Sequence, residues 1–254
     1  MSTLKLTNLS KRFGGVVASE DVNIEVPAGK IIGLIGPNGA GKTTIVNMIT
    51  GMLPVSGGEI HVGDVDITHA PAHEICRAGL ARTFQNIRLL SEATVLENVM
   101  IGFHRHETSS TIAALLGLAS VGYETANIKK RALGILKEFD LLDFAEYPAK
   151  GLSYGHQRKV EMARAMATSP DFILLDEPVA GMNEVESRGL AKIFRGLAKE
   201  GKGVLLIEHN VRFVSDLCTM IYVLDGGRLI SHGPPKDVLN DPVVKSAYLG
   251  TEHA

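Results

Sequence analysis

The chain has 254 residues, 45% of them hydrophobic and 21% charged, and its formal net charge is −2. This composition is ordinary for a folded globular chain and lacks the basic excess of nucleic-acid-binding domains, so we expect no nucleic-acid partner. The two cysteines lie far apart and outside any C-x-x-C pairing, which predicts free thiols. The longest apolar stretch, 112–121, is shorter than the roughly 18 residues that span a bilayer, and no signal-peptide pattern opens the chain. We therefore expect a cytoplasmic protein.

The first third of the chain is predicted to alternate strands with turns and short helices. Strands are predicted for residues 3–12, 16–26, 31–35, 57–62 and 80–84. Short helices are predicted for 44–51 and 71–78. The second of these helices begins at a proline, which suits a first turn.

From residue 86 to about 150 the pattern becomes helical, with apolar repeats over 95–100 and 126–139. The Ser/Thr/Gly-containing stretch 105–123 is predicted to be a surface loop with a short helix. Later elements are predicted as apolar strands at 172–175 and 203–207, a helix at 184–198, a hairpin over 220–232 and two short closing helices. Apolar strands alternating with helices indicate a parallel sheet with crossover helices.

One stretch, Gly36–Thr43, fits the phosphate-binding pattern G-x-x-x-x-G-K-[ST] and lies between a predicted strand and a predicted helix. Its glycines let the backbone N–H groups turn toward a phosphate, and the helix N-terminus adds positive potential. Lys42 could then reach the β and γ phosphates, and Thr43 could ligate Mg²⁺. The residues predicted to bind nucleotide here are Gly36, Asn38, Gly39, Ala40, Gly41, Lys42, Thr43 and Thr44. The alternative is a chance glycine-rich turn.

A second pattern follows the apolar run 172–175, where the predicted strand ends in Asp176 and Glu177. Beside a P-loop, this arrangement is similar to a Walker B motif. Asp176 would hold Mg²⁺ and Glu177 would act as general base toward the attacking water. The alternative is that the two acids cap the next helix.

The segment Gly151–Arg158 resembles the L-S-G-G-Q signature of ATP-binding cassette (ABC) ATPases. The resemblance implies that Ser153 and Gly155 meet the γ-phosphate held by the opposite subunit of a head-to-tail dimer. Ser153 is also a good helix N-cap, and both roles are compatible. Tyr154 stands in place of the first signature glycine and His156 in place of glutamine, and the effect of each is left open.

Three further positions match the family. Gln85 resembles the Q-loop glutamine, which implies contact with Mg²⁺ or the attacking water, and His209 resembles the switch histidine that senses the γ-phosphate. Phe13 matches the aromatic residue that stacks on adenine. The alternatives are a solvent-facing glutamine, a surface histidine and a core phenylalanine. Asn183 occupies a position where most of the family has aspartate.

The resemblance covers essentially the whole chain and implies one domain: an α/β P-loop NTPase core of the ABC ATPase type with an antiparallel β subdomain. The core would take in 1–85 and 168–254, and 86–167 would be an inserted helical subdomain.

A narrower resemblance is to the ATPase subunits of branched-chain amino acid importers. It is carried by Lys11–Gly15, Ala81–Gln85, the Tyr154–Gly155 signature, Ala180–Asn183 and Ala247–Gly250. It implies ATP and Mg²⁺ as cofactors, membrane permease subunits as partners, a place at the cytoplasmic face of the membrane, and a homodimer or a heterodimer with a related ATPase. The alternatives are a soluble ABC ATPase in an assembly or scaffold role, and a nucleotide-binding regulator with little turnover. Import direction and the solute remain open at this point.

Overall fold

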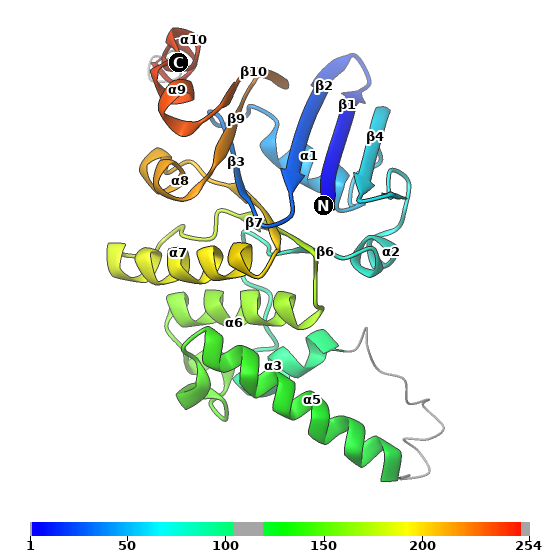
Figure 1. Ribbon diagram of the computed structural model, residues 1–254, viewed down its shortest axis with the longest axis vertical. Helices are drawn as coiled ribbons and strands as arrows, with labels where there is room; N and C mark the ends of the chain where they lie inside the picture. The colour runs from blue at the N-terminus through cyan, green and yellow to red at the C-terminus, as the bar shows by residue number, and fades with distance from the viewer. Residues whose placement is uncertain (1, 104–118, 250–254) are drawn as a thin grey trace. The chain divides into compact units, whose positions relative to one another are not determined.

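A computed structural model of the protein describes residues 2–103 and 119–249 (Figure 1). Its internal contacts divide the chain into two compact units. The first, here called the sheet unit, takes in Met1–Arg82, Asp171–Pro178 and Phe194–Ala254. The second, the helical unit, takes in Thr83–Pro170 and Val179–Ile193. The helical unit therefore includes 179–193, a segment outside the predicted insertion.

The sheet unit contains a six-stranded sheet with strand order β10-β9-β3-β8-β7-β6. Its strands are β10 (Arg228–Gly233), β9 (Met220–Asp225), β3 (Ile31–Ile35), β8 (Gly203–Ile207), β7 (Phe172–Asp176) and β6 (Leu80–Arg82). All neighbours pair in parallel except β10, which forms the predicted antiparallel hairpin with β9. Every residue of β3, β7 and β8 is buried, because parallel strands are covered on both faces. The predicted parallel sheet is confirmed.

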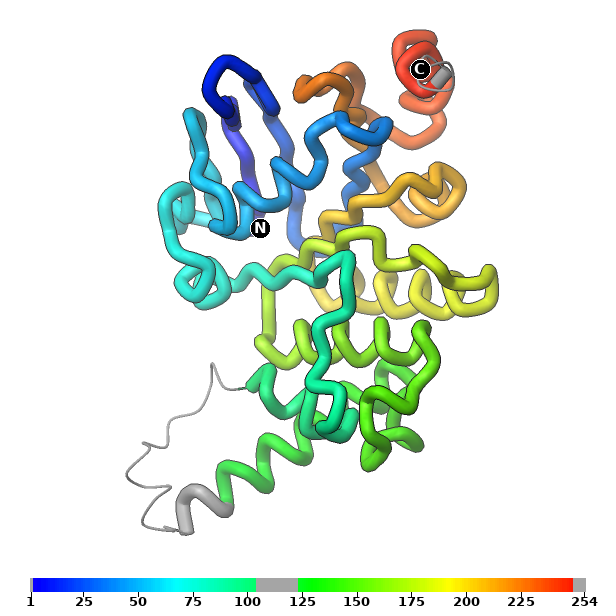
Figure 2. Tube along the Cα trace, turned by 180° about the vertical axis from the view of Figure 1, so that it is seen from behind, coloured from blue at the N-terminus to red at the C-terminus, as the bar shows by residue number. Residues whose placement is uncertain are grey.

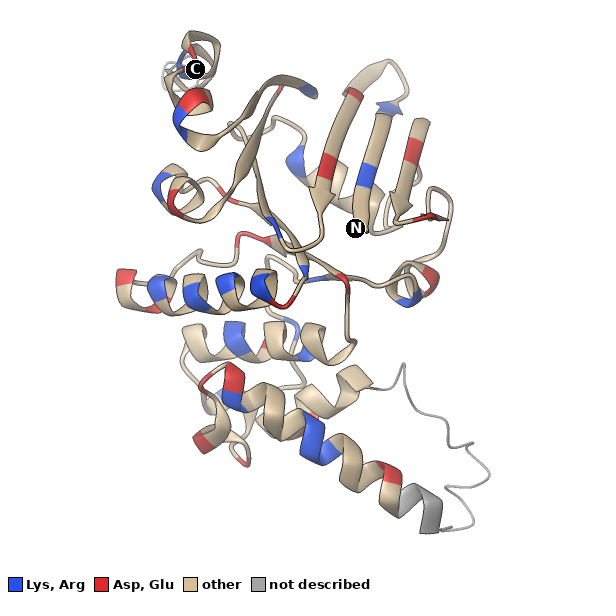
Figure 3. Ribbon diagram, viewed as in Figure 1, with Lys and Arg blue, Asp and Glu red and all other residues tan. Residues whose placement is uncertain are grey.

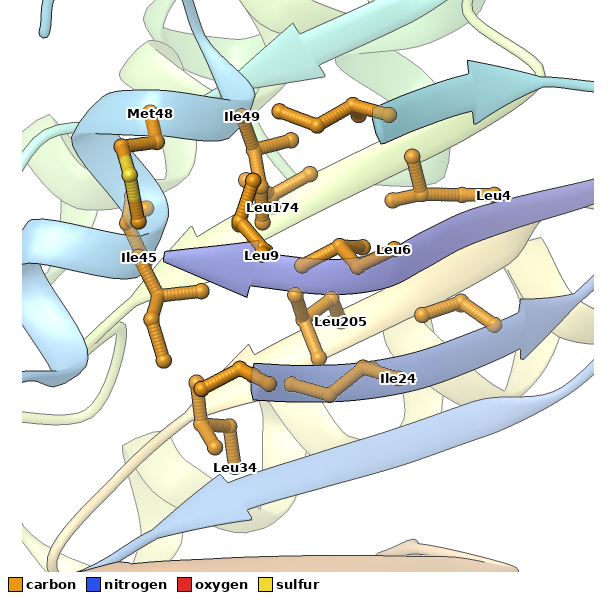
Figure 4. Close-up of a cluster of buried hydrophobic side chains, with 14 of the residues drawn as sticks. Leu4, Leu6, Leu9, Ile24, Leu34, Ile45, Met48, Ile49, Leu174 and Leu205 are labelled. Carbon is orange, nitrogen blue, oxygen red and sulfur yellow. The ribbon is translucent and has the colours of Figure 1, made fainter. Parts of the chain in front are cut away.

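A second, antiparallel sheet has the order β2-β1-β4-β5, and its first three strands run side by side in Figure 2. These strands are β1 (Thr3–Phe13), β2 (Val16–Pro27), β4 (Gly57–Val62) and β5 (Val65–Asp66). Inward-facing residues of β1 and β2 pack with α1 (Lys42–Ile49) and with side chains of the parallel sheet in one core (Figure 4). The members labelled in that view include Leu4, Leu6, Leu9, Ile24, Ile45, Met48, Leu174 and Leu205. This core anchors α1 and hence the loop before it.

The helical unit is built around α3 (Val95–Ile101), α5 (Ala119–Glu138) and α6 (Tyr154–Ala167), with α3 packed on both of the others. Two short 3-10 turns, η2 (Leu142–Phe144) and η3 (Ala149–Gly151), lead to α6. The following helix, α7 (Glu184–Lys199), carries basic residues on successive turns of its exposed face (Figure 3). That polar face and a buried face containing Leu190, Phe194 and Leu197 explain its helical pattern in the sequence.

The remaining helices are α2 (Ala72–Arg77), α8 (Val211–Leu217), α9 (Pro235–Asn240) and α10 (Pro242–Leu249). The predicted helix 71–78 and the two closing helices are confirmed. Helix α8 was not predicted; it is only seven residues long, and Asn210 starts it by accepting a hydrogen bond from the Phe213 amide. Among the described residues, no helix combines the length and the apolar character that crossing a bilayer requires.

Three predicted boundaries were wrong. The strand predicted over 80–84 ends at Arg82. The expected loop over 105–123 lies largely outside the described residues, but its last part, 119–123, belongs to α5, which begins seven residues before the predicted 126. The described side chains at this end of α5 are not buried, with Tyr123 78% exposed, so the structure gives no packing contact that explains the extension. Helix α1 begins at Lys42 rather than at 44, so the end of the P-loop motif is already helical.

Candidate functional site

The loop between β3 and α1 approaches its neighbours so closely that two of its positions admit no side chain. A Cβ on Gly36 would lie 2.1 Å from the Leu224 carbonyl oxygen, and one on Gly41 would lie 2.8 Å from the Ala18 carbonyl oxygen. Gly41 also has a φ of 104°, a conformation that favours glycine. The loop is thereby held against the backbone of β9 and β2.

The first turn of α1 is left without a side-chain cap. Its N-cap is Gly41, and no acidic residue lies in the first turn. The helix dipole therefore presents its positive end at this loop, an arrangement that favours a bound anion. Asn38, Gly39 and Thr43 are exposed there, Thr44 is half-buried, and Ala40 is buried with its carbonyl accepting from the Gly227 amide at 2.9 Å.

The Lys42 side chain folds back over the loop. Its Nζ donates to the Gly36 oxygen at 2.7 Å and to the Pro37 oxygen at 2.9 Å. Burial lowers the pKa of Lys42, and the nearby carboxylates of Glu177 and Asp176 act in the opposite direction. An ammonium held by two backbone oxygens near carboxylates is suited to exchange these partners for a phosphate.

The two acids of the second motif lie at the end of β7. Asp176 is almost fully buried, and its Oδ2 accepts from Arg82 at 2.9 Å. Glu177 takes a φ of 49°, and its amide donates to the Ile207 oxygen at 2.9 Å. Its Oε1 lies 3.8 Å from Nδ1 of His209, which follows β8. The acids do not cap α7; the Asn183 side chain does, accepting from two amides at that helix start.

The carboxyl ends of β3, β7 and β8 therefore bring the P-loop lysine, both carboxylates and His209 to one edge of the parallel sheet. Open α/β sheets bind their ligands at this edge. Phe13 lies elsewhere in the sheet unit, at the end of β1, and is 50% exposed with the Lys11 ammonium 5.1 Å from its ring centre. It is a surface aromatic residue and not part of the core.

The signature residues start α6 in the helical unit. The Ser153 hydroxyl is the N-cap and accepts from the His156 amide at 3.4 Å, while Nδ1 of the same histidine lies 3.2 Å from it. The His156 ring also packs on Phe144, with ring centres 4.6 Å apart. Gly155 is buried, and a Cβ there would lie 2.7 Å from an oxygen of Glu186.

Gln85 also belongs to the helical unit, and its backbone is tied to α6. The Arg158 guanidinium donates to the Phe84 and Gln85 carbonyl oxygens, and it pairs with Glu161 at 3.0 Å. The side chains of Arg158 and Glu161 are 1% and 2% exposed, and burial raises the pKa of Glu161. The Gln85 side chain itself is exposed. The sequence interpretation assigned no role to Arg158, Glu161 or Arg82, and no local pattern in the sequence marks these three residues.

The sequence profile of ABC transporters matches residues 19–180, well over half of the chain. The chain belongs to the ABC transporter family. A second profile, that of the branched-chain amino acid ATP-binding cassette transporter, matches residues 228–254.

Several relatives cover nearly the full length. The chain is 38% identical over 248 residues, 97% of each chain, to the high-affinity branched-chain amino acid transport ATP-binding proteins BraF of Pseudomonas aeruginosa and LivG of Escherichia coli K12. It is 36% identical over 252 residues, 99% of each chain, to the lipopolysaccharide export system ATP-binding protein LptB of E. coli K12.

Solved structures agree with the fold. A nucleotide-free ATP-binding cassette of an ABC transporter superposes with a TM-score of 0.85 at 33% identity, covering 98% of this chain and 99% of that one. A dimeric cassette in a post-hydrolysis state, bound to ADP and Pi, matches with a TM-score of 0.76 at 25% identity over 91% of this chain and 98% of that one. The predicted ABC ATPase fold is confirmed.

Proposed function

We propose that this chain is the ATP-binding and ATP-hydrolysing subunit that powers a membrane ABC transporter. The observation that carries the proposal is the edge of the parallel sheet where Lys42, Asp176, Glu177 and His209 meet an uncapped helix start. The Lys42 cation, the two carboxylates and the uncapped N-terminus of α1 are the kinds of group that phosphoryl transfer needs. The relatives named as ATP-binding proteins of transporters support the same conclusion.

The P-loop residues bind the triphosphate in this proposal. The backbone of Gly36, Asn38, Gly39, Ala40, Gly41 and Thr44 surrounds the phosphates, and Lys42 exchanges its two carbonyl partners for them. Phe13, an exposed aromatic residue, stacks on adenine.

The residues present fit Mg²⁺. The described part of the chain contains no group of three or more His, Cys, Asp or Glu able to hold a metal by themselves. Mg²⁺ in nucleotide sites is held by only one or two side chains together with phosphates and water. Thr43 and Asp176 would supply the oxygen ligands, and Gln85 would be a third contact. The bound ion would supply positive charge that stabilises the charge on the phosphates.

Hydrolysis depends on groups at the ends of β7 and β8. Glu177 accepts the proton of the attacking water, and its half-buried carboxylate lies 3.8 Å from Nδ1 of His209. His209 donates to the γ-phosphate. Gln85 orients the water from the helical unit.

The working form is a head-to-tail dimer, with a second copy or with a related ATPase. Ser153 and Gly155 of one subunit meet the γ-phosphate bound by the P-loop of the other. The dimeric cassette bound to ADP and Pi supports pairing in this family. Membrane permease subunits hold the dimer at the cytoplasmic face of the membrane.

The transported solutes are branched-chain amino acids, and the direction is import. Whole-chain identity separates the candidates poorly, because the lipopolysaccharide export protein is 36% identical and the amino acid transport proteins are 38% identical. The match of residues 228–254 to the branched-chain amino acid profile is the more specific support.

The test is to express the chain with the permease and binding-protein genes that neighbour it and to measure leucine uptake and ATP hydrolysis in proteoliposomes. Glu177→Gln should lower hydrolysis by roughly 10²- to 10⁴-fold, the usual contribution of a general base, while ATP binding remains. Glu184→Gln is the control, because Glu184 is exposed and pairs only along its own helix with Arg188 at 3.6 Å.

Leucine-dependent hydrolysis that depends on Glu177 supports the proposal. A chain that hydrolyses ATP but never co-purifies with a permease would favour the soluble assembly role instead. Full activity in Glu177→Gln would contradict the assigned base.

A further inference from the structure

The guanidinium of Arg82 lies at the centre of a buried polar cluster in the sheet unit. One of its nitrogens donates to Asp176 Oδ2 at 2.9 Å, and another donates to Asn47 Oδ1 at 2.7 Å and to Thr50 Oγ1 at 3.2 Å. The side chains of Arg82 and Asp176 are only 9% and 8% exposed. No motif of the sequence analysis assigned this arginine a role.

The cluster joins three elements that carry the candidate site. Arg82 is the last residue of β6, which pairs in parallel with β7, and Asp176 ends β7. Asn47 and Thr50 come from α1 and the residue after it, on the helix that Lys42 begins. The Thr50 hydroxyl is itself oriented, because it donates to the Val46 oxygen at 2.9 Å. The planar guanidinium of Arg82 therefore fixes the position of the Asp176 carboxylate relative to α1.

We infer that Arg82 is a positioning residue that presets Asp176 for the Mg²⁺ of bound ATP. The inference rests on the proposed function of this site. Arg82 takes one carboxylate oxygen, Oδ2, and thereby fixes the direction of the other. Replacing a residue that hydrogen-bonds to a metal ligand and orients it commonly changes the metal affinity by about 10- to 100-fold.

A competing effect has the opposite sign. A guanidinium beside the carboxylate also repels a divalent cation, so a purely electrostatic view expects Mg²⁺ to bind more tightly once Arg82 is removed. Orientation should dominate, because an unpaired Asp176 would be left buried and free to turn, and holding it for the ion would then cost binding energy. The two views differ in the sign of one measurable quantity.

That quantity is the ratio of the affinity for a fluorescent ATP analogue with Mg²⁺ to the affinity in EDTA. We expect Arg82→Gln to lower the ratio by about tenfold while the affinity in EDTA stays at the wild-type value. Arg228→Gln is the matched control, since Arg228 pairs with Glu20 at the surface and is 69% exposed. It should leave both affinities unchanged.

A second variant, Asn47→Ala, tests the same inference if Arg82→Gln does not fold. Asn47→Ala leaves Arg82 and Asp176 in place but removes the anchor on α1, and it should lower the ratio in the same direction by a smaller factor. In an Asp176→Asn background, Arg82→Gln should change the ratio no further.

Three results would overturn the inference. The first is an unchanged or higher ratio in Arg82→Gln, and the second is an equal loss of both affinities, which would indicate a merely structural role. The third is an additional loss of ratio in the Asp176→Asn background. A wild-type ratio of one would instead remove the proposed Mg²⁺ site itself, and the inference with it.

Discussion

Two helices of this chain, α1 and α6, begin at motifs expected to meet phosphate, and they begin differently. The N-cap of α1 is Gly41, which has no side chain to cap the helix. Helix α6 starts at Ser153, whose hydroxyl already accepts from the His156 amide. Neither has an acid in its first turn, whereas α3 closes its own start with the Thr94–Glu97 capping box.

The difference indicates which site acts first. At α1 no side chain caps the N-terminal amides, and Lys42 donates to the Gly36 and Pro37 oxygens of the same loop, so we expect one chain by itself to bind a phosphate group. At α6 a ligand competes with a cap that contributes about 1 kcal/mol. Charge-assisted hydrogen bonds to a phosphate can exceed that, but only when the phosphate is brought to the loop. We infer that the signature loop works on nucleotide that another subunit already holds.

The largest effect on nucleotide binding by the single chain should come from Lys42→Ala. It removes a charge-assisted contact, which we expect to weaken ATP binding by about 10- to 100-fold and to abolish detectable turnover. Isothermal titration calorimetry measures the binding. Lys5→Ala is the control, because Lys5 is an exposed residue paired with Glu25 at 3.2 Å. A wild-type ATP affinity in Lys42→Ala would show that the P-loop does not bind the nucleotide.

A smaller effect should distinguish two glycines of the same loop. Gly39 and Gly41 both have positive φ, at 79° and 104°, but a Cβ on Gly39 meets nothing within 4 Å and one on Gly41 meets the Ala18 oxygen at 2.8 Å. Gly39→Ala should cost about 1 kcal/mol of conformational strain. Gly41→Ala should add the steric cost and lower both the unfolding midpoint and the ATP affinity. Equal unfolding midpoints for the two variants would show that the loop is not held as tightly as the close approach implies.

Local sequence signals were sufficient for the P-loop side of this comparison. The strands β3, β7 and β8 are continuous apolar runs, and the glycine-rich loop is contiguous, so pattern alone placed the Lys42 loop directly after β3 and Asp176 at the end of β7. The partners that fix these residues were not visible. Arg82 reaches Asp176 across 94 residues of chain, and no local pattern records such a pairing.

The helical unit was predicted less well for the same reason. Helix α5 begins seven residues before the predicted start, in residues of weak helical preference, and Arg158 reaches the Phe84 carbonyl from 74 residues away. The structure confirms the N-cap role of Ser153, which was the alternative interpretation of this residue. Its role toward phosphate stays a prediction.

The smallest effect on the single chain should come from Ser153→Asp, with Ser153→Asn as its matched control. Aspartate, asparagine and serine are about equally good N-caps, so both variants should keep the stability of α6 to within about 0.5 kcal/mol and keep the ATP affinity of one chain. Only aspartate adds a negative charge that repels a partner's triphosphate. In a Glu177→Gln background with Mg-ATP, size-exclusion chromatography should detect dimers for Ser153→Asn and not for Ser153→Asp. Equal dimer populations would contradict a phosphate contact at this loop.

The most direct test of the head-to-tail account mixes two chains that are each inactive. In a Lys42→Ala chain paired with a Ser153→Asp chain, one composite site carries both changes and the other carries neither. Mixing should therefore restore ATP hydrolysis, up to about a quarter of the wild-type rate per chain if pairing is random and the sites act independently. If the wild-type chain hydrolyses ATP by itself and no mixing ratio restores activity, the P-loop of one copy does not work with the signature loop of the other, and the central claim is contradicted.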